Sequence, residues 1–295
     1  QLQHPGIAPV YELGPFGDQR PFFTMKLVKG KTLAALLSQR ETPDQDQAKL
    51  LGSFEQVCPT MAYAHSRNVV HRDLKPANIM VGAFGEVQVM DWGLAKVLQA
   101  GGIADETKAV AKPKDMSVIE TIRSGGSNTF NDAPAVGSQT RAGSVMGTPA
   151  YMPPEQAMGE TDTLDERADV FGLGAILCEI LTGSPPYVAD DGHQVLRMAI
   201  QGNLADCKER LSHSDAHPEL IELANHCLAV DATKRPKDAG VIAARVTEHL
   251  ESVAKQLKQA ELRRKLTYVV AASLLLLVTG LGTGGVWLQA KETEA

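Results

Sequence analysis

The sequence lacks the cysteine and charge patterns of several protein classes. Its four cysteines, among 295 residues, are widely spaced and include no C-x-x-C pair, which argues against a zinc cluster or a disulfide framework and indicates a reducing compartment. Basic residues do not predominate: 29 Lys and Arg stand against 35 Asp and Glu, so the net charge is −6 and no nucleic-acid partner is expected. The motifs G-x-S-x-G and H-E-x-x-H are also absent, which disfavours the hydrolytic chemistries that use them.

One long hydrophobic run stands near the C-terminus. Residues 267–288 are 22 positions without a charge, enough for a helix to cross the ~30 Å hydrocarbon layer at ~1.5 Å per residue. Tyr268 and Trp287, near its two ends, suit the headgroup layers. The alternative is a buried core helix, but the glycines of this run would weaken a helix in water. We therefore predict a single transmembrane helix over residues 267–288.

Charges beside this run set its expected orientation. The juxtamembrane helix 251–266 carries five basic and two acidic residues, whereas residues 289–295 carry one basic and two acidic residues. The positive-inside rule then predicts a single-pass protein of the cell membrane, with residues 1–266 cytoplasmic and 289–295 an extracytoplasmic stub. Membrane lipid is an expected partner, since each basic side chain near anionic headgroups contributes ~1 kcal/mol.

Apolar residues recur in steps of four and three just before the hydrophobic run. This spacing is typical of a short coiled coil, which would allow a homodimer through the juxtamembrane helix. The alternative is a last domain helix that packs on its own domain and then runs to the membrane, and the short length of two heptads slightly favours this alternative. The seam consists of Val246, Leu250, Val253, Leu257 and Ala260.

The rest of the chain alternates ordered segments with one polar stretch. Residues 97–142 are rich in Ala, Gly, Ser, Thr and Asp, which predicts a flexible loop. Residues 22–28 predict a short apolar strand, and two β-rich runs around GAFGE predict a hairpin over residues 79–90. Helices are predicted over residues 46–66 and 168–182. The second is apolar on nearly all sides, as expected at the centre of a domain.

One group of polar residues has the composition that phosphoryl transfer requires. The stretch HRDLKPAN contains Asp73, Lys75 and Asn78, and Asp91 follows in DWG. A carboxylate can orient and deprotonate a hydroxyl, a cation can lie beside the transferred phosphate, and amide and carboxylate oxygens can hold Mg²⁺. Because a hairpin can return Asp91 beside Asn78, a shared metal site is geometrically plausible.

Taken in order, these motifs resemble those of eukaryotic-type Ser/Thr protein kinases of the bacterial, membrane-anchored kind. The signature H-R-D-L-x-x-x-N is complete. It is followed by GTPAYMPPEQ at 147–156, DVFGLG at 169–174 and KRP at 234–236. The resemblance extends from about His4 to Leu250, which is essentially the whole chain before the hydrophobic run.

The resemblance implies an α+β, protein-kinase-like fold. Residues 1–28 would be a remnant of the N-lobe sheet with the hinge, and residues 29–250 the mainly helical C-lobe. Within the C-lobe, residues 94–146 would be a long activation segment with a flexible insert. A single transmembrane helix would follow.

The resemblance also assigns catalytic roles. Asp73 would be the catalytic base and Lys75 the cation beside the γ-phosphate of ATP, a residue typical of specificity for Ser and Thr. Thr148 would brace these two side chains. Asn78 and Asp91 would hold Mg²⁺.

Four further positions match the nucleotide-binding residues of the family. Met25 falls at the gatekeeper position, the backbone of Lys26 and Val28 would contact adenine at the hinge, and Met80 would form the apolar floor under the ring. Without the motifs, Met25 and Met80 would be interpreted as ordinary core residues.

The remaining matches concern structure and regulation. Glu155 and Arg235 match a buried ion pair that fixes the activation segment, and Asp169 matches an aspartate that anchors the catalytic-loop backbone. Arg72 precedes the base, which implies control by a phosphate on the activation segment. The candidate acceptors, in order of preference, are Ser144, Thr140 and Ser138.

Three features depart from the family pattern. Trp92 in DWG replaces a phenylalanine, which should alter the inward or outward preference of the segment more than its metal chemistry. Pro153 in PPE replaces an alanine and stiffens that turn. The activation segment of 53 residues, over 94–146, is longer than usual.

The Gly-rich phosphate loop and the lysine-bearing strand of the family are not found. The chain begins at Gln1 rather than Met, so we expect a truncated kinase rather than a degenerate one, and we expect these 295 residues alone to transfer phosphate negligibly.

The main hypothesis is a membrane-tethered kinase that phosphorylates Ser and Thr of protein substrates. The alternatives are a catalytically inactive pseudokinase or receptor scaffold, and a small-molecule phosphotransferase, which Arg72 and Lys75 disfavour because such enzymes usually carry Gly and His there.

Overall fold

The computed structural model describes residues 2–15, 20–98 and 147–292, with side chains in the last helix described as far as Val269. Two compact units divide the chain, Gln1–Arg245 and Val246–Ala295. Most of the predicted flexible loop, with the candidate acceptors Ser138, Thr140 and Ser144, lies outside the described residues.

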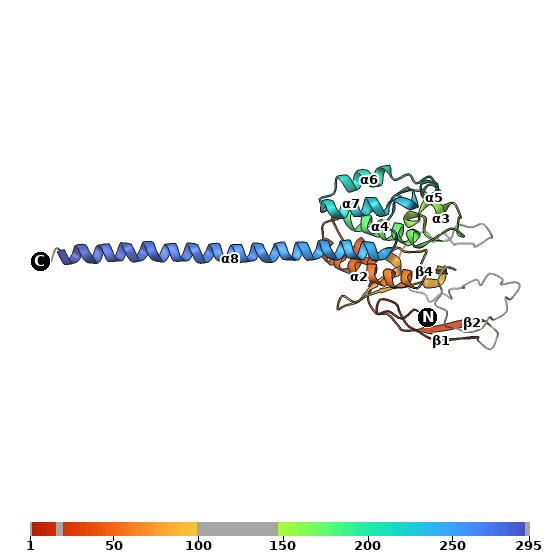
Figure 1. The fold of residues 1–295 in the computed structure, drawn as a ribbon, viewed down its shortest axis with the longest axis horizontal. Coiled ribbons are helices and arrows are strands. Elements are labelled where there is room, and N and C mark those ends of the chain that lie inside the picture. The colour runs from red at the N-terminus through yellow and green to blue at the C-terminus, as the bar shows by residue number, and fades with distance from the viewer. Residues whose placement is uncertain (1, 16–19, 99–146, 293–295) are drawn as a thin grey trace. The chain divides into compact units, whose positions relative to one another are not determined.

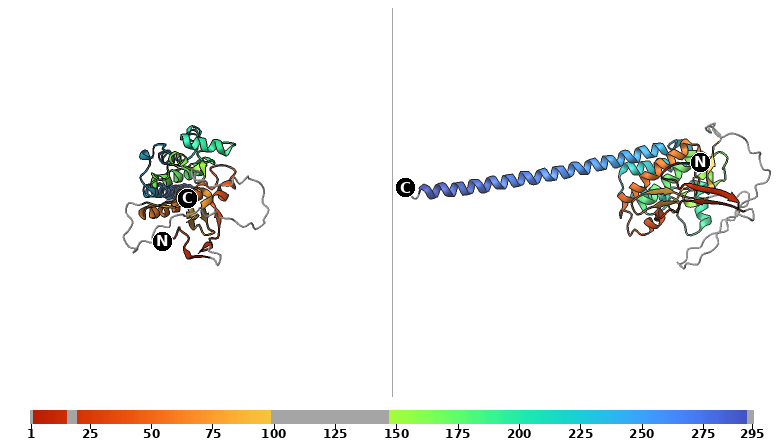
Figure 2. Two further views of the ribbon diagram at one scale, coloured as in Figure 1. Left: turned by 90° about the vertical axis from the view of Figure 1, so that its right-hand side faces the viewer. Right: turned by 90° about the horizontal axis from the view of Figure 1, so that it is seen from below.

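An antiparallel pair of strands opens the first unit. Strand β1 (Val10–Pro15) pairs with β2 (Pro21–Met25), and Leu13 lies opposite Phe23. Figure 2 shows the two strands side by side. The predicted strand over residues 22–28 is wrong at its end, because β2 stops at Met25 and Leu27 is 80% exposed. The physical reason is that the partner strand β1 begins at Val10. Beyond the paired residues, Lys26 N–H still bonds to the Pro9 carbonyl, but β1 offers no further residues with which β2 could pair.

A three-stranded sheet contains the predicted hairpin. Strands β5 (Ile79–Val81) and β6 (Val87–Val89) pair antiparallel, and β3 (Lys31–Thr32) lies on the other side of β5. Gly85 in the turn has φ +85°, a conformation that favours glycine. The predicted hairpin over residues 79–90 is confirmed.

Helix α4 (Glu166–Thr182) forms the centre of the first unit. Thirteen of its 17 residues are buried, and it packs against α2 (Gln47–Ser66) and α7 (Pro218–Cys227). The Asp165 side chain accepts a hydrogen bond from Arg167 N–H at its start, and Gly183 ends it with φ +80°. Both predicted helices are confirmed within two residues at each end (Figure 1).

The other described elements of this unit are short. A small antiparallel pair joins β4 (Val69–Val70) to β7 (Lys96–Val97). The remaining α-helices before the last one are α1 (Leu33–Ser38), α3 (Pro154–Ala157), α5 (Gly192–Gln201) and α6 (Ala205–Ser212). The 3₁₀ turns are Pro76–Asn78, Trp92–Leu94, Pro149–Tyr151 and Ala232–Lys234.

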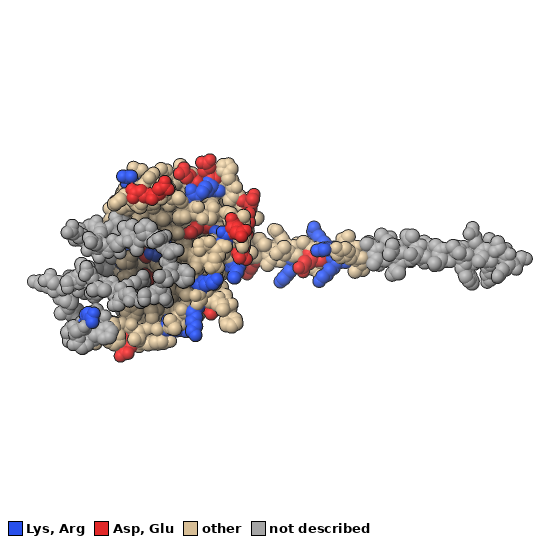
Figure 3. Space-filling model, turned by 180° about the vertical axis from the view of Figure 1, so that it is seen from behind, with Lys and Arg blue, Asp and Glu red and all other residues tan. Residues whose placement is uncertain are grey.

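Helix α8 (Ala239–Glu292) is unbroken, as the right-hand view of Figure 2 shows. Exposed basic side chains gather on its stretch over residues 255–265 (Figure 3). Among the described residues, no helix has a stretch apolar and long enough for a membrane span. All but the first three residues of the predicted span, 267–288, lie beyond the described side chains.

Candidate active site

One buried carboxylate holds the loop between β4 and β5 in place. Asp169, on α4, accepts hydrogen bonds from the backbone N–H of His71 (2.7 Å) and of Arg72 (2.9 Å). The His65 side chain on α2 adds a third contact of 3.0 Å. Burial by itself raises the pKa of Asp169, but the bonds and charge from His65 and His71 outweigh it, so the pKa is lowered. An ionised Asp169 therefore fixes the loop, including Arg72 at φ +68°.

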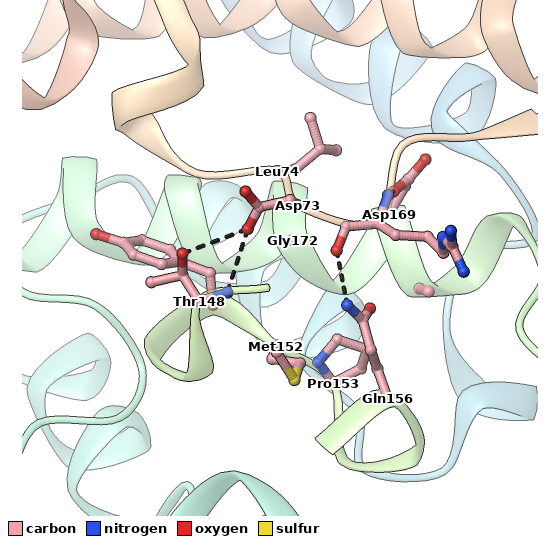
Figure 4. Close-up of a pocket in the computed structure, with 11 residues that line it drawn as sticks. Asp73, Leu74, Thr148, Met152, Pro153, Gln156, Asp169 and Gly172 are labelled. Atoms are coloured by element: carbon pink, nitrogen blue, oxygen red, sulfur yellow. Dashed lines mark hydrogen bonds between the residues drawn. The ribbon is translucent and has the colours of Figure 1, made fainter. Parts of the chain in front are cut away.

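Four predicted catalytic and metal-binding side chains meet on this loop or beside it. The Oδ2 atom of Asp73 accepts from Lys75 Nζ (2.7 Å) and from Asn78 Nδ2 (3.1 Å). Its Oδ1 accepts from the backbone N–H of Thr148 (3.2 Å) and from the Thr148 hydroxyl (3.3 Å), as Figure 4 shows. Lys75 Nζ also donates to Thr148 Oγ1 (2.7 Å). The structure thus brings Asp73, Lys75, Asn78 and Thr148 into one hydrogen-bonded cluster.

This cluster leaves one cationic donor available. The side chains of Lys75 and Asp73 are 22% and 9% exposed, so the ion pair is largely shielded yet still open on one side. An ammonium group has three donors, and two of those on Lys75 go to Asp73 and Thr148. The third has no partner among the described residues and can contact an anionic group such as a phosphate.

Within the described part of the chain, both predicted metal ligands have an oxygen atom that accepts no hydrogen bond. Both amide hydrogens of Asn78 go to Asp73, one to its backbone carbonyl (2.8 Å), which leaves Asn78 Oδ1 as an acceptor. The carboxylate of Asp91 has no donor among the described residues. Met90 N–H bonds to the Asn78 carbonyl (2.7 Å), and Asp91 is the next residue of the chain after Met90. An amide and a carboxylate oxygen suit Mg²⁺, which prefers oxygen ligands, so these residues fit the predicted ion.

Trp92 attaches the start of the activation segment to the same loop. Its indole N–H donates to the Val89 carbonyl (3.0 Å), and its ring meets the edge of His71 with centroids 4.7 Å apart. His71 Nε2 in turn contacts the Met90 carbonyl at 3.0 Å. Arg72 Nε donates to the Leu94 carbonyl. Phenylalanine could form the ring contact but not the indole hydrogen bond, so Trp92 is held to this loop by one more hydrogen bond than phenylalanine would be.

The segment after the insert is also tied to the loop. Gln156 Nε2 donates to the Arg72 carbonyl (2.7 Å), and the Tyr151 hydroxyl donates to Glu179 Oε2 on α4 (2.7 Å). Gly147 has φ +115°, a backbone conformation in which a side chain would be strained, and a side-chain carbon there would also lie 3.1 Å from Met152 Cε and 3.2 Å from Gln156 Nε2. Between loop and segment lies a hollow of about 10 Å³, roughly one water molecule, lined by Asp73, Thr148 and Gln156 among others (Figure 4).

Glu155 and Arg235 form the ion pair that the sequence suggested. The two guanidinium nitrogens of Arg235 lie 2.6 and 2.9 Å from the carboxylate oxygens of Glu155. The Arg235 side chain is fully buried and stacks over the Phe171 ring at 5.0 Å. The remaining Arg235 donors reach the carbonyls of Ala229, Val230 and Arg167.

The predicted nucleotide residues belong to strands β2 and β5 and to the segment between β2 and β3. Met25 ends β2, Lys26 and Val28 follow before β3, and Met80 is the middle residue of β5. The N–H of Lys26 is bonded to Pro9, so its carbonyl is the backbone group left for a ligand. Contact of these four residues with adenine stays a prediction, as does the regulatory role of Ser144, which lies outside the described residues.

Two contributors were missed in the sequence. His65 holds Asp169 through Nε2 and accepts Ala239 N–H at Nδ1 (3.1 Å), but a single histidine within a helix has no distinguishing pattern. Glu179 holds Tyr151 across 28 residues, and the apolar composition around it suggested only a core helix.

A carboxylate–lysine–threonine cluster with an asparagine bonded to the same carboxylate is the arrangement of a phosphoryl-transfer site. The protein kinase domain model matches residues 1–114 and 129–250, and the chain belongs to this family. The unmatched residues 115–128 fall within the predicted insert. The predicted α+β, kinase-like fold is confirmed at this level.

Similar proteins are bacterial Ser/Thr kinases. The chain is 32% identical over 259 residues to the serine/threonine-protein kinase PknD of Chlamydia muridarum, an alignment that covers 85% of this chain and 26% of that protein. It is 28% identical over 275 residues to PknD of Protochlamydia amoebophila, covering 90% and 26%. The chain therefore spans about a quarter of the length of these curated relatives.

Proposed function

We propose that this chain is the catalytic part of a kinase that transfers the γ-phosphoryl group of ATP to Ser and Thr hydroxyls of proteins. The observation that carries the proposal is the hydrogen-bonded cluster of Asp73, Lys75 and Thr148. Asn78 is bonded to the Asp73 carboxylate, and Asp91 directly follows Met90, whose N–H bonds to the Asn78 carbonyl. The family match and the similarity to Ser/Thr kinases support it.

Each side chain of the cluster has a defined task in this proposal. When bound, ATP supplies the phosphoryl group and Mg²⁺ neutralises the charge on the phosphate oxygens. Asp73, an acceptor held by donors on both oxygens, orients the incoming hydroxyl and takes up its proton. Lys75 directs its third N–H toward the phosphate, and Thr148 keeps Lys75 and Asp73 at fixed separation. Asn78 and Asp91 offer the oxygen ligands for the metal.

The test is phosphate transfer by the full-length protein. We expect Asp73→Asn to lower turnover by ~10²–10⁴-fold while nucleotide affinity changes little, because the base acts in the transfer step. Asp215→Asn is the matched control, since Asp215 is exposed and remote from the cluster in the sequence. Nucleotide binding without transfer by the unmodified protein would favour the pseudokinase or scaffold instead.

The proposal includes tethering to the cell membrane through residues 267–288, with the kinase domain cytoplasmic. Its support is the uncharged run of 22 residues and the exposed basic side chains that precede it on α8. A homodimer through the seam of α8 is a further part of the proposal. Leu257, a seam residue, is 63% exposed, and a second copy of the helix would cover it.

A further inference from the structure

Two cysteines outside the catalytic cluster face each other in the first unit. Cys178 lies on α4 and Cys207 on α6, and their sulfur atoms are 3.4 Å apart across a sequence separation of 29 residues. Both are free thiols and both are buried, at 0% and 1% exposure. Neither takes part in the phosphoryl-transfer chemistry described above.

We propose that Cys178 and Cys207 are a modification site, at which a peroxide-class oxidant forms a reversible disulfide between α4 and α6. A disulfide has an S–S distance of ~2.05 Å, so the two sulfurs need to approach by only about 1.4 Å. The overall reaction consumes one peroxide and two thiols and yields one disulfide and two waters.

The surroundings of the pair distinguish the two sulfurs. The hydrogen bond from Cys207 lowers the pKa of Cys178 against the effect of burial, and contacts with Thr182 and the charge of Arg210 act in the same direction. The pKa of Cys207 is raised by the same contact and by burial. Arg210 is held nearby by its bond to the Pro185 carbonyl (2.6 Å).

This asymmetry sets the order of the steps. The Cys178 thiolate attacks one peroxide oxygen, the O–O bond breaks, and Cys178 becomes a sulfenic acid as hydroxide leaves. The Cys207 sulfur then attacks the Cys178 sulfur, the S–O bond breaks, and the hydroxyl leaves as water after it takes the thiol proton.

Access requires only the opening of α6. This helix has eight residues, its capping position Leu204 makes no side-chain hydrogen bond to it, and within it only Cys207 and Leu211 are buried. An element with so few buried contacts is expected to open locally at low free-energy cost. A slight opening of α6 that keeps the two sulfurs in contact would admit peroxide to Cys178, while α4 keeps its place in the core.

The other two cysteines provide matched controls. Cys58 and Cys227 are also buried free thiols, and burial raises the pKa of both. No sulfur–sulfur hydrogen bond joins either to another cysteine within the described part of the chain. They test whether buried thiols whose sulfurs are not in hydrogen-bond contact give the same chemistry, since Cys227 lies near enough to Cys58 to raise its pKa.

The experiment treats the full-length protein with graded hydrogen peroxide, blocks remaining thiols in denaturant and maps the tryptic peptides without reduction. The four cysteines fall in four different tryptic peptides, with Cys178 in residues 168–197 and Cys207 in residues 198–208. We expect a cross-linked pair of these two peptides that has lost two hydrogen atoms. Dithiothreitol should restore both thiols, and Cys58 and Cys227 should remain blockable throughout.

Variants decide whether the pairing is specific. Cys207→Ala should abolish the cross-link and slow the oxidation of Cys178, because it also removes the hydrogen bond that lowers the pKa of Cys178, whereas Cys58→Ala should leave the cross-link intact. The proposal is overturned if no such peptide pair forms at any peroxide dose that preserves the helical circular dichroism. A cross-link from Cys178 to Cys58 or Cys227 would overturn it as well.

Discussion

All the hydrogen-bond donors of the Arg235 guanidinium have partners inside the fold. It contacts both oxygens of Glu155 and three backbone carbonyls, and none of its side chain is exposed. Arg235→Met removes these donors and leaves the Glu155 carboxylate, 19% exposed, without its partner. We expect the free energy of unfolding to fall by ~3–5 kcal/mol, measured by urea denaturation, because an uncompensated buried charge is costly.

The pair Arg245 and Glu222 is the control for this substitution. Its oxygen–nitrogen distance is 3.2 Å, but the two side chains are 34% and 72% exposed. Glu222→Gln should change the free energy of unfolding by less than ~1 kcal/mol, since water screens an exposed pair. Equal losses for the buried and the exposed pair would contradict the argument.

Glu179 should give the stability of the protein a measurable pH dependence. Burial raises its pKa above the usual 4.5, although the Tyr151 hydroxyl and Arg40 act in the opposite direction. The folded state therefore prefers the protonated acid. Its contribution is fully present below pH 4.5 and is lost as the pH rises through the raised folded-state pKa.

The test compares melting temperatures of the unmodified protein and Glu179→Gln from below pH 4.5 to neutral pH. Glutamine cannot ionise and can still accept from Tyr151, so the difference should move in favour of the variant as the pH rises. Parallel melting curves at all pH values would show that the carboxyl group does not titrate abnormally.

The meeting of side chains could be predicted where the residues lie close together in the sequence. Asp73, Lys75 and Asn78 lie within six residues, so their meeting could be inferred from the motif. Thr148 lies 75 residues from Asp73 and could be assigned only by resemblance. His65 and Glu179 could not be found, because the fold brings their partners from distant segments of the chain.

At the scale of elements, the close packing of α4 against α7 depends on one glycine. A side-chain carbon at Gly174 would lie 2.5 Å from Cys227 Cβ, far inside van der Waals contact. Gly174→Ala should therefore lower the free energy of unfolding by ~1–3 kcal/mol, since the two helices must separate. Gly52→Ala in α2 is the control, because nothing lies within 4 Å of its added carbon. It should instead raise stability by ~0.5–1 kcal/mol, and a similar loss in both variants would refute the packing argument.

Elements with a strong local pattern could be predicted from the sequence. The hairpin over 79–90 and the apolar helix over 168–182 each have a composition that favours one structure. The two-residue strands β3, β4 and β7 have no such pattern, because they exist only through pairing with distant residues. The end of β2 was missed for the same reason.

At the scale of the whole molecule, α8 separates charged from uncharged sequence. Its exposed residues over 255–265 include five basic side chains, and the uncharged run begins at Thr267. If this run crosses a membrane, the hydrophobic effect holds the protein there and salt should not release it. If only the basic side chains bind lipid, high salt should release it, because screening shortens the range of their attraction.

We expect the full-length protein to remain in the membrane fraction after washing with concentrated salt. Deletion of residues 267–288 should release it into the supernatant, whereas replacing the basic residues with glutamine should leave it bound. Leu275→Arg is a sharper test, since an arginine near the centre of a span costs ~2.5–3.5 kcal/mol on insertion. The basic residues to replace are Lys255, Lys258, Arg263, Arg264 and Lys265. Release by salt alone, with no effect of the deletion in low salt, would rule out the tether and leave a surface attachment through the basic stretch of α8.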